Sequence, residues 1–275
     1  MTVINTNISA IRAANASNSA AKSLGMAMER LSTGKRINSA KDDAAGMAIA
    51  TSMTSQVKGM NQAIRNSNDG IALAQTAEGS LGEVTNMLQR IRELAVQSAS
   101  GTYADATDRT YMQGEVDQLT SQIDQVITNT KFNGVVLFDG STPTVTIQAG
   151  ANTADTVALT LADLTTLAAS GGAAASYDVS TAAAANALLS TLDTELGAIS
   201  SSRATLGAGQ NRLESVVNSL TSNSTNLSDA RSRIEDTDYS AETTAMAKAQ
   251  ILSQASTAMI AQANQSQQNV LSLLR

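Results

Sequence analysis

Three successive charged residues, Lys41, Asp42 and Asp43, form the grouping in this sequence that is best suited to chemistry. Neighbouring carboxylates can hold a divalent cation or exchange protons with a substrate. The sequence has 0 His and 0 Cys, so the commonest general base and the thiolate nucleophile are both missing, although a carboxylate or Ser–Lys mechanism stays open. We therefore interpret residues 41–43 as a charged link between structural elements, and we predict no catalytic residue, no metal site and no cofactor.

The composition narrows the class of protein further. A net charge of −6 argues against binding to nucleic acid or to an anionic membrane. The sequence has no uninterrupted apolar run of about 18 residues, which predicts that no segment spans a membrane. Residues 1–21 lack the apolar stretch of a secretory signal, so general rules alone would place the protein in the cytoplasm. Aromatic residues make up only 2% of the chain, which favours small-residue helices in extended contact over a bulky globular core.

An apolar residue recurs at every seventh position through much of the C-terminal half. This spacing is typical of a helix that packs along its length against other helices. The interleaved series is mixed, because Leu196 and Val217 are apolar whereas Arg203 and Ser224 are polar. The repeat predicts the heptad of an inner helical rod, with the members Leu192, Ile199, Leu206, Leu213, Leu220, Leu227 and Ile234.

Three further helices are indicated in the N-terminal half. Apolar spacing predicts a first helix that ends at Gly34, because glycine suits the left-handed C-cap of a helix. A long helix is predicted from about residue 45 to residue 98, where Gly70 and Gly79 each cost about 1 kcal/mol relative to Ala. Asp105 is predicted to cap the helix that follows.

The first and last thirds of the sequence mirror each other around a short β region. Residues 132–161 hold β-branched runs bounded by Gly, Asn and Asp, which predict a small β-hairpin element. Pairing of the outer helices and of the inner helices gives a mainly α fold. The expected architecture is an elongated two-tier helical bundle, a terminal coiled-coil tier plus an inner rod. The expected segments are 1–44 and 235–275 for the terminal tier, 45–134 and 183–234 for the rod, and 135–182 for the central β and loop region.

Long motifs in both halves resemble those of bacterial flagellin. They are LSTGKRINSAKDDAAGMAIA (31–50), LQRIRELAVQSASGT (88–102), TKFNGVVLFDG (130–140), LGAGQNRLESVVNSL (206–220) and the C-terminal segment 230–275. The likeness covers residues 1–140 and 181–275. Many flagellins carry large outer domains between these two arms, so this chain resembles a short form that lacks them.

The resemblance implies a structural protein and not an enzyme. Flagellins are self-assembling subunits of the bacterial flagellar filament, the helical propeller for motility. The implied partners are further copies of the chain, a flagellar export chaperone, and the filament cap and hook–filament junction proteins. The implied location is the extracellular flagellar filament, reached by type III export without a cleaved signal peptide, which replaces the cytoplasmic expectation above.

Two groups of residues become candidate interaction sites. The apolar residues near both ends are expected to form the polymer core, and they are Ile4, Ile8, Ile11, Leu24, Met28, Leu31, Leu252, Met259, Val270 and Leu274. Gln89, Arg90, Leu94 and Glu115 fall in segments that match those bound by the innate flagellin receptor of the Toll-like family. The alternative for this second group is an exposed Arg/Glu helix face with Leu94 packed nearby, and both interpretations can hold together.

Two alternative functions stay open at this point. A hook–filament junction protein shares the terminal architecture, but it is expected to have a larger middle and weaker likeness at 31–50 and 130–140. A type III-secreted coiled-coil interaction protein would not extend filament seeds. An enzyme is the least supported alternative.

Overall fold

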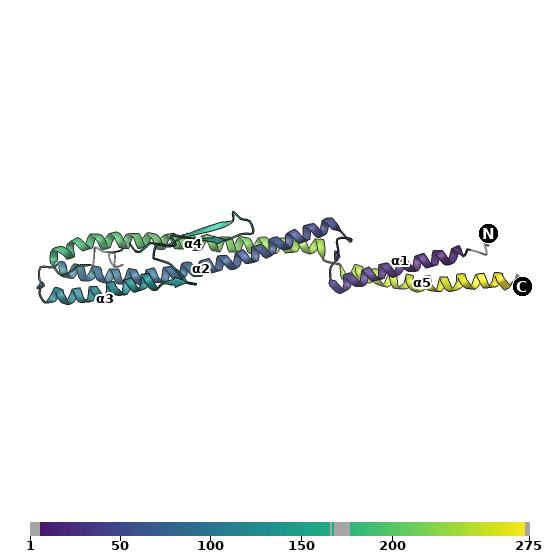
Figure 1. Cartoon of the computed structure of the whole chain (residues 1–275), viewed down its shortest axis with the longest axis horizontal. Coiled ribbons are helices and arrows are strands. Elements are labelled where there is room, and N and C mark those ends of the chain that lie inside the picture. The colour runs from purple at the N-terminus through teal and green to yellow at the C-terminus, as the bar shows by residue number, and fades with distance from the viewer. Residues whose placement is uncertain (1–5, 166, 168–176, 273–275) are drawn as a thin grey trace. The chain divides into compact units, whose positions relative to one another are not determined.

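The computed structural model describes residues 6–165, 167 and 177–272, with side chains described up to residue 266. The described chain is mainly helical, which confirms the predicted fold class (Figure 1). Its helices are α1 (Ile8–Thr33), α2 (Ala44–Ala99), α3 (Asp108–Asn129), α4 (Ala182–Glu235) and α5 (Tyr239–Ser272). Its strands form two antiparallel hairpins, β1 (Lys131–Phe132) with β2 (Val135–Val136) and β3 (Thr144–Gln148) with β4 (Thr156–Thr160). The chain divides into two compact units, residues 1–57 with 225–275, and residues 58–224.

The first unit pairs α1 with α5 in antiparallel fashion. At one end the side-chain amide of Asn7 donates to the carbonyl of Ala263 at 3.0 Å. At the other end the Tyr239 hydroxyl donates to the carbonyl of Leu31 at 3.2 Å. Helix α1 ends as predicted at Gly34, whose φ of 72° lies in the left-handed region that favours glycine.

The link after α1 is held to the segment between α4 and α5 by backbone hydrogen bonds. The amide of Arg36 donates to the carbonyl of Glu235 at 2.7 Å, and the amide of Thr237 donates to the carbonyl of Gly34 at 3.0 Å. The Lys35 ammonium adds an ion pair to the Glu235 carboxylate at 2.5 Å. The link is therefore fixed within this unit although its sequence is largely polar, and its one large apolar residue, Ile37, is buried.

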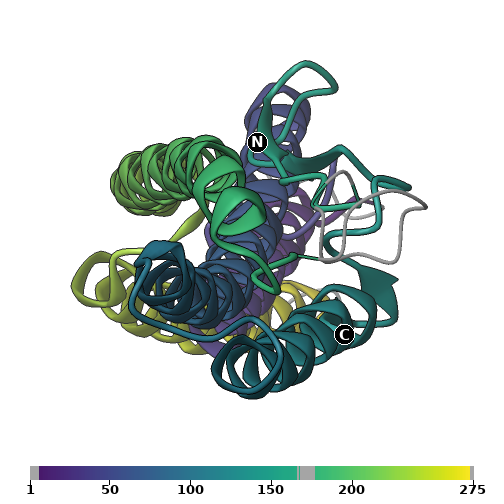
Figure 2. The ribbon, with the colours of Figure 1, turned by 90° about the vertical axis from the view of Figure 1, so that its left-hand side faces the viewer.

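The second unit is built on α2, with α3 and α4 along it (Figures 1 and 2). Ion pairs between α2 and α4 join Arg92 to Asp193 at 2.7 Å and Glu78 to Arg203 at 3.7 Å. The residue that comes later in α2 pairs with the residue that comes earlier in α4, so the two helices run antiparallel. Four members of the predicted heptad are buried in this core, namely Leu192, Ile199, Leu206 and Leu213. Leu220, Leu227 and Ile234 are only half-buried, and the last two fall in the first unit.

Two glycines allow the β3–β4 hairpin to approach the helices closely. A Cβ atom on Gly209 of α4 would lie 2.5 Å from Cδ2 of Leu159, which is itself buried. A Cβ atom on Gly70 of α2 would lie 2.9 Å from Cγ1 of Ile147. Packing of the hairpin therefore offsets the helix cost of Gly70, whereas Gly79 has open space around it and no such compensation.

The turn between α2 and α3 is organised around a buried arginine. The guanidinium of Arg109 donates to the carbonyls of Ser98 at 2.9 Å, Ser100 at 2.8 Å and Tyr103 at 2.6 Å. It also pairs with the carboxylate of Asp105, so the prediction that Asp105 caps α3 was wrong. The arginine binds the turn because it donates to several acceptors from one rigid plane.

Candidate functional site

The carboxylates of Asp42 and Asp43, which the sequence singled out as the best candidates for chemistry, form hydrogen bonds with nearby backbone amides. The Asp42 carboxylate accepts hydrogen bonds from the amide of Ser39 at 2.9 Å and from the amide of Asn38 at 3.2 Å. These bonds, the one from Ser39 first, lower the pKa of Asp42. The Asp43 carboxylate accepts from the amide of Gly46 at 2.9 Å in the first turn of α2. Within the described residues no group of His, Cys, Asp or Glu is arranged to hold a metal ion.

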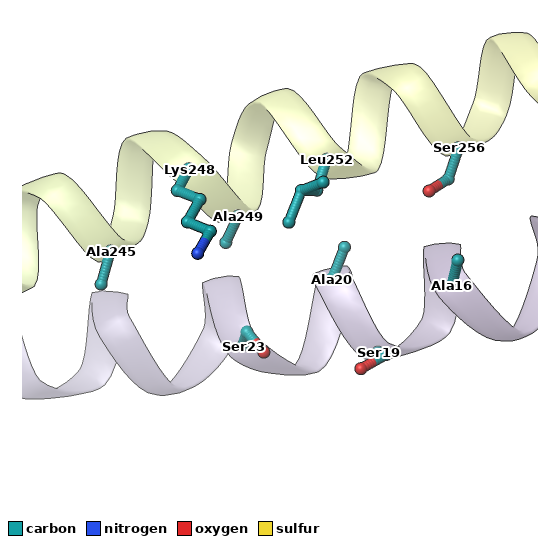
Figure 3. Close-up of a pocket in the computed structure, with 9 residues that line it drawn as sticks. All are labelled: Ala16, Ser19, Ala20, Ser23, Ala245, Lys248, Ala249, Leu252 and Ser256. Atoms are coloured by element: carbon teal, nitrogen blue, oxygen red, sulfur yellow. The ribbon is translucent and has the colours of Figure 1, made fainter.

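The seam between α1 and α5 is made of small side chains. On α1 the buried residues are Ala20 and Ala27, seven positions apart. On α5 the buried residues Ala249, Ser256 and Ala263 keep the same seven-residue spacing. Small residues at the contact line allow two helices to approach closely, but they bury little apolar area. Figure 3 shows Ala20 of α1 and Ala249 of α5 between the two helices.

The large apolar side chains of the same helices remain exposed. Among the predicted polymer-core residues, Ile8 is 51% exposed, Met28 51% and Met259 63%. Ile11 and Leu252 are exposed as well, whereas Leu24 and Leu31 are half-buried. Ile4 and Leu274 lie outside the described residues, and the side chain of Val270 is not described. The structure therefore brings the described members of this set to one helix pair, but it leaves most of them uncovered within the chain.

A groove of about 480 Å³ follows the α1–α5 pair (Figure 3). Its lining combines Ala16, Ser19, Ala20 and Ser23 of α1 with Ala245, Lys248, Ala249, Leu252 and Ser256 of α5. The lining is mostly small side chains, with the charged Lys248 among them. Leu252, which points between the two helices in Figure 3, is 48% exposed.

The four residues of the predicted receptor contact divide between surface and core. Arg90 on α2 pairs with Glu115 on α3 at 2.8 Å, and both side chains are close to half exposed. The hydrogen bond to Glu115 raises the pKa of Arg90, and Gln89 beside it is exposed. Leu94 is 3% exposed and belongs to the hydrophobic core. An exposed charged face with Leu94 packed beneath it is therefore what this part of the chain presents.

Sequence reasoning missed other exposed apolar residues and the buried arginine. Met26 at 43%, Ile49 at 48% and Ile251 at 65% exposure belong to the same unit as the predicted core stripe. Their spacing falls on other faces of the helices, so a search along one stripe passes over them. Arg109 had no periodic signal at all, because its partners are the carbonyls of an irregular turn.

The comparisons with known proteins agree with this arrangement. The model of the bacterial flagellin N-terminal helical region matches residues 4–142, and that of the C-terminal helical region matches residues 189–274. The chain belongs to the bacterial flagellin family. It is 46% identical to a flagellin of Halalkalibacterium halodurans, over 90% of this chain and 91% of that one. It is 43% identical to a flagellin of Bacillus subtilis, over 99% of both.

Solved structures extend the likeness to the fold. The crystal structure of Bacillus cereus flagellin matches with a TM-score of 0.51 and 34% identity, over 61% of this chain and 94% of that one. A Vibrio parahaemolyticus structure named for the flagellar hook matches with a TM-score of 0.62, over 71% of this chain and 100% of that one. At 15% identity it bears on the fold alone. Full-length likeness to filament flagellins supports the filament subunit over the junction-protein alternative.

The family fixes the broad function of this flagellin. It is a structural subunit that polymerises with its own copies into the extracellular flagellar filament, and it is not an enzyme. The helices of the described chain include none that is long and apolar enough to cross a membrane.

Proposed function

We propose that the exposed apolar faces of α1 and α5 are the surfaces through which copies of this flagellin polymerise. The observation that carries the proposal is the contrast within one helix pair. The buried residues described in the pair are all Ala or Ser, whereas Ile8, Ile11 and Leu252 remain about half exposed. A protein that worked alone would gain nothing from leaving these side chains in water.

The expected gain is large enough to matter in a polymer. Full burial of an Ile, Leu or Met side chain contributes about 1.5–3 kcal/mol. Side chains that are already half buried would each contribute about 1 kcal/mol on assembly. Each subunit meets neighbours along its whole length, so several such contributions add up and offset the loss of rotational and translational freedom.

The two compact units correspond, in this proposal, to the terminal tier and the inner rod of a filament subunit. The first unit carries the exposed apolar residues, and the second has its own buried core along α2, α3 and α4. Deleting residues 241–275 is expected to abolish polymerisation, while the helices of the second unit stay folded. Circular dichroism and sedimentation would measure the two properties separately. Filaments formed by the truncated chain would contradict the proposal.

Point variants test the surface itself. Ile11→Asn and Leu252→Asn should prevent extension of filament seeds, because each places an amide at a contact that assembly would bury. Gln250→Ser, on an exposed position of α5, is the matched control and should assemble like the parent. All three monomers should stay folded, with only small shifts in melting temperature, because Gln250 is exposed and the side chains of Ile11 and Leu252 are already about half exposed in the free chain. Normal seed extension by both asparagine variants would refute the proposal.

The finer partners belong to the same proposal. The export chaperone is assigned to the C-terminal segment 235–275, and the filament cap and hook–filament junction proteins to the terminal tier. The support is that this tier presents apolar surface which must be covered before and during assembly. Pull-down with the cognate chaperone, comparing the parent with the 241–275 deletion, would test the first assignment.

Recognition by the Toll-like flagellin receptor is assigned to Gln89, Arg90 and Glu115, with Leu94 acting from beneath. Arg90→Glu should weaken the response of reporter cells to the monomer, because it reverses a charge on the exposed face and breaks the pair with Glu115. Arg92→Glu, which breaks the pair with Asp193 on α4 instead, is the matched control. Equal potency of Arg90→Glu and the parent would count against the assignment.

A further inference from the structure

Three methionines stand out on the surface of the first unit. Met26 and Met28 on α1 are 43% and 51% exposed, and Met259 on α5 is 63% exposed. Met112 in the second unit is 7% exposed and lies in the hydrophobic core. The chain therefore contains both accessible and protected thioethers, and the accessible ones lie on the two helices that carry the proposed polymer surface.

The packing of α1 on α5 does not shelter these sulfurs. The buried positions of the seam are Ala and Ser, with Ala27 lying between Met26 and Met28 in the sequence. A flexible, polarisable methionine fills irregular gaps at an interface well, so it suits a surface that must fit neighbouring copies. The same exposure leaves the sulfur open to oxidants as long as the chain is free.

We propose that reversible oxidation of Met26, Met28 and Met259, three separate exposed positions on the α1–α5 pair, blocks polymerisation. This inference rests on the proposed function of α1 and α5. The oxidant is a peroxide: the thioether sulfur supplies an electron pair to one peroxide oxygen, a sulfur–oxygen bond forms and the oxygen–oxygen bond breaks. One peroxide oxygen stays on the sulfur as the sulfoxide, and the other leaves with both protons as water.

The sulfoxide changes the chemistry of the surface in a defined way. It replaces an apolar group by a strong hydrogen-bond acceptor, and burying an unpaired polar group is unfavourable. Because the side chains are exposed in the free chain, the modification leaves the fold of the monomer intact and acts on assembly. Methionine sulfoxide reductases, which take one sulfoxide epimer each, return the thioether and restore assembly: a dithiol supplies the two electrons and becomes a disulfide, and the sulfoxide oxygen leaves as water.

The central experiment treats the full-length monomer with hydrogen peroxide and measures seed extension. Peptide mass spectrometry should locate sulfoxide at Met26, Met28 and Met259, with Met112 unmodified. The critical concentration for extension should rise at least about tenfold, in keeping with the cost of buried unpaired polar groups. Treatment with both classes of reductase should restore the original value. Unchanged extension by a monomer oxidised at these three positions would overturn the inference.

The variant M26L/M28L/M259L is the matched control. Leucine keeps the surface apolar and has no sulfur, so the variant should extend seeds like the parent, before and after peroxide. If peroxide blocks the variant as strongly as the parent, other methionines are responsible and the assignment fails. If Ile11→Asn and Leu252→Asn both assemble normally, the proposed polymer surface itself fails, so the two failures are distinguishable.

Discussion

Replacing Arg109 by methionine should destabilise the second unit more than any other single change of a charged residue considered above. The side chain of Arg109 is 4% exposed and spans the irregular turn between α2 and α3. It donates to three backbone carbonyls, those of Ser98, Ser100 and Tyr103, and pairs with Asp105. Methionine fills a similar volume but donates nothing, so the change isolates the polar contacts.

The loss of stability depends on which hydrogen-bond partners of Arg109 can bind water in its place. Hydrogen bonds to a charged group contribute about 1.5–3 kcal/mol, and breaking up a buried charged group costs about 3–5 kcal/mol in total. Ser100 is exposed and the Asp105 side chain is 67% exposed, so these acceptors can turn to solvent. Ser98 is fully buried and its carbonyl cannot. We therefore expect Arg109→Met to lower the free energy of unfolding by about 2–4 kcal/mol.

Urea titration of the monomer by circular dichroism, with hydrogen exchange of α3 peptides as a local readout, measures this loss. Arg212→Met is the control, because Arg212 is exposed on α4 and should change the free energy of unfolding by less than about 0.5 kcal/mol. Arg109→Lys should fall between the two, since lysine cannot reproduce the planar fork. A loss below about 0.5 kcal/mol for Arg109→Met would refute the clamp role given to this residue.

Four further changes have defined outcomes. Gly209→Ala should destabilise the second unit, because its Cβ would lie 2.5 Å from Leu159, a buried leucine of β4. Gly79→Ala should instead stabilise α2 by about 0.5–1 kcal/mol, because its Cβ would lie in open space. Thermal melts of the two variants measure both effects. Ser67→Ala should raise the free energy of unfolding by about 1 kcal/mol, because the Ser67 hydroxyl is buried without a partner among the described residues, and a lower urea midpoint would contradict this. The hydrogen bond from Arg92 lowers the pKa of Asp193 below its usual 3.8. The Arg92–Asp193 pair therefore stabilises the folded chain fully above pH 3.8, and this stabilisation is lost as the pH falls through the lowered pKa. When the urea midpoint is plotted against pH, Asp193→Asn should therefore show a smaller fall at acid pH than the parent. An equal fall in the two proteins would argue that the pair contributes nothing to stability.

The heptad of α4 was the most predictable part of the fold. A strict seven-residue repeat indicates both a helix and the face that it buries, and Leu192 to Leu213 are buried as the pattern requires. The pattern could not show that Leu220, Leu227 and Ile234 would be only half-buried. Burial at those positions depends on which other elements lie beside the helix, and that information is spread over the rest of the sequence.

The first unit shows what helical spacing alone leaves open. Ala249, Leu252, Ser256, Met259 and Ala263 all fit helical spacing, and Leu252 and Met259 were predicted to belong to the polymer core. Within the chain it is the small residues that are buried. Spacing identifies a face of a helix but not the distance to its partner, and a close antiparallel pair selects Ala and Ser for the contact line. The large residues are then left for contacts that a single chain does not contain.

Electron cryo-microscopy of filaments grown from this chain is the most direct test of the central claim. The account predicts that Ile8, Ile11, Leu252 and Met259 contact side chains of neighbouring copies and lose most of the exposure that they have in the free chain. Filaments in which these side chains still face solvent, with other surfaces making the contacts between subunits, would contradict it.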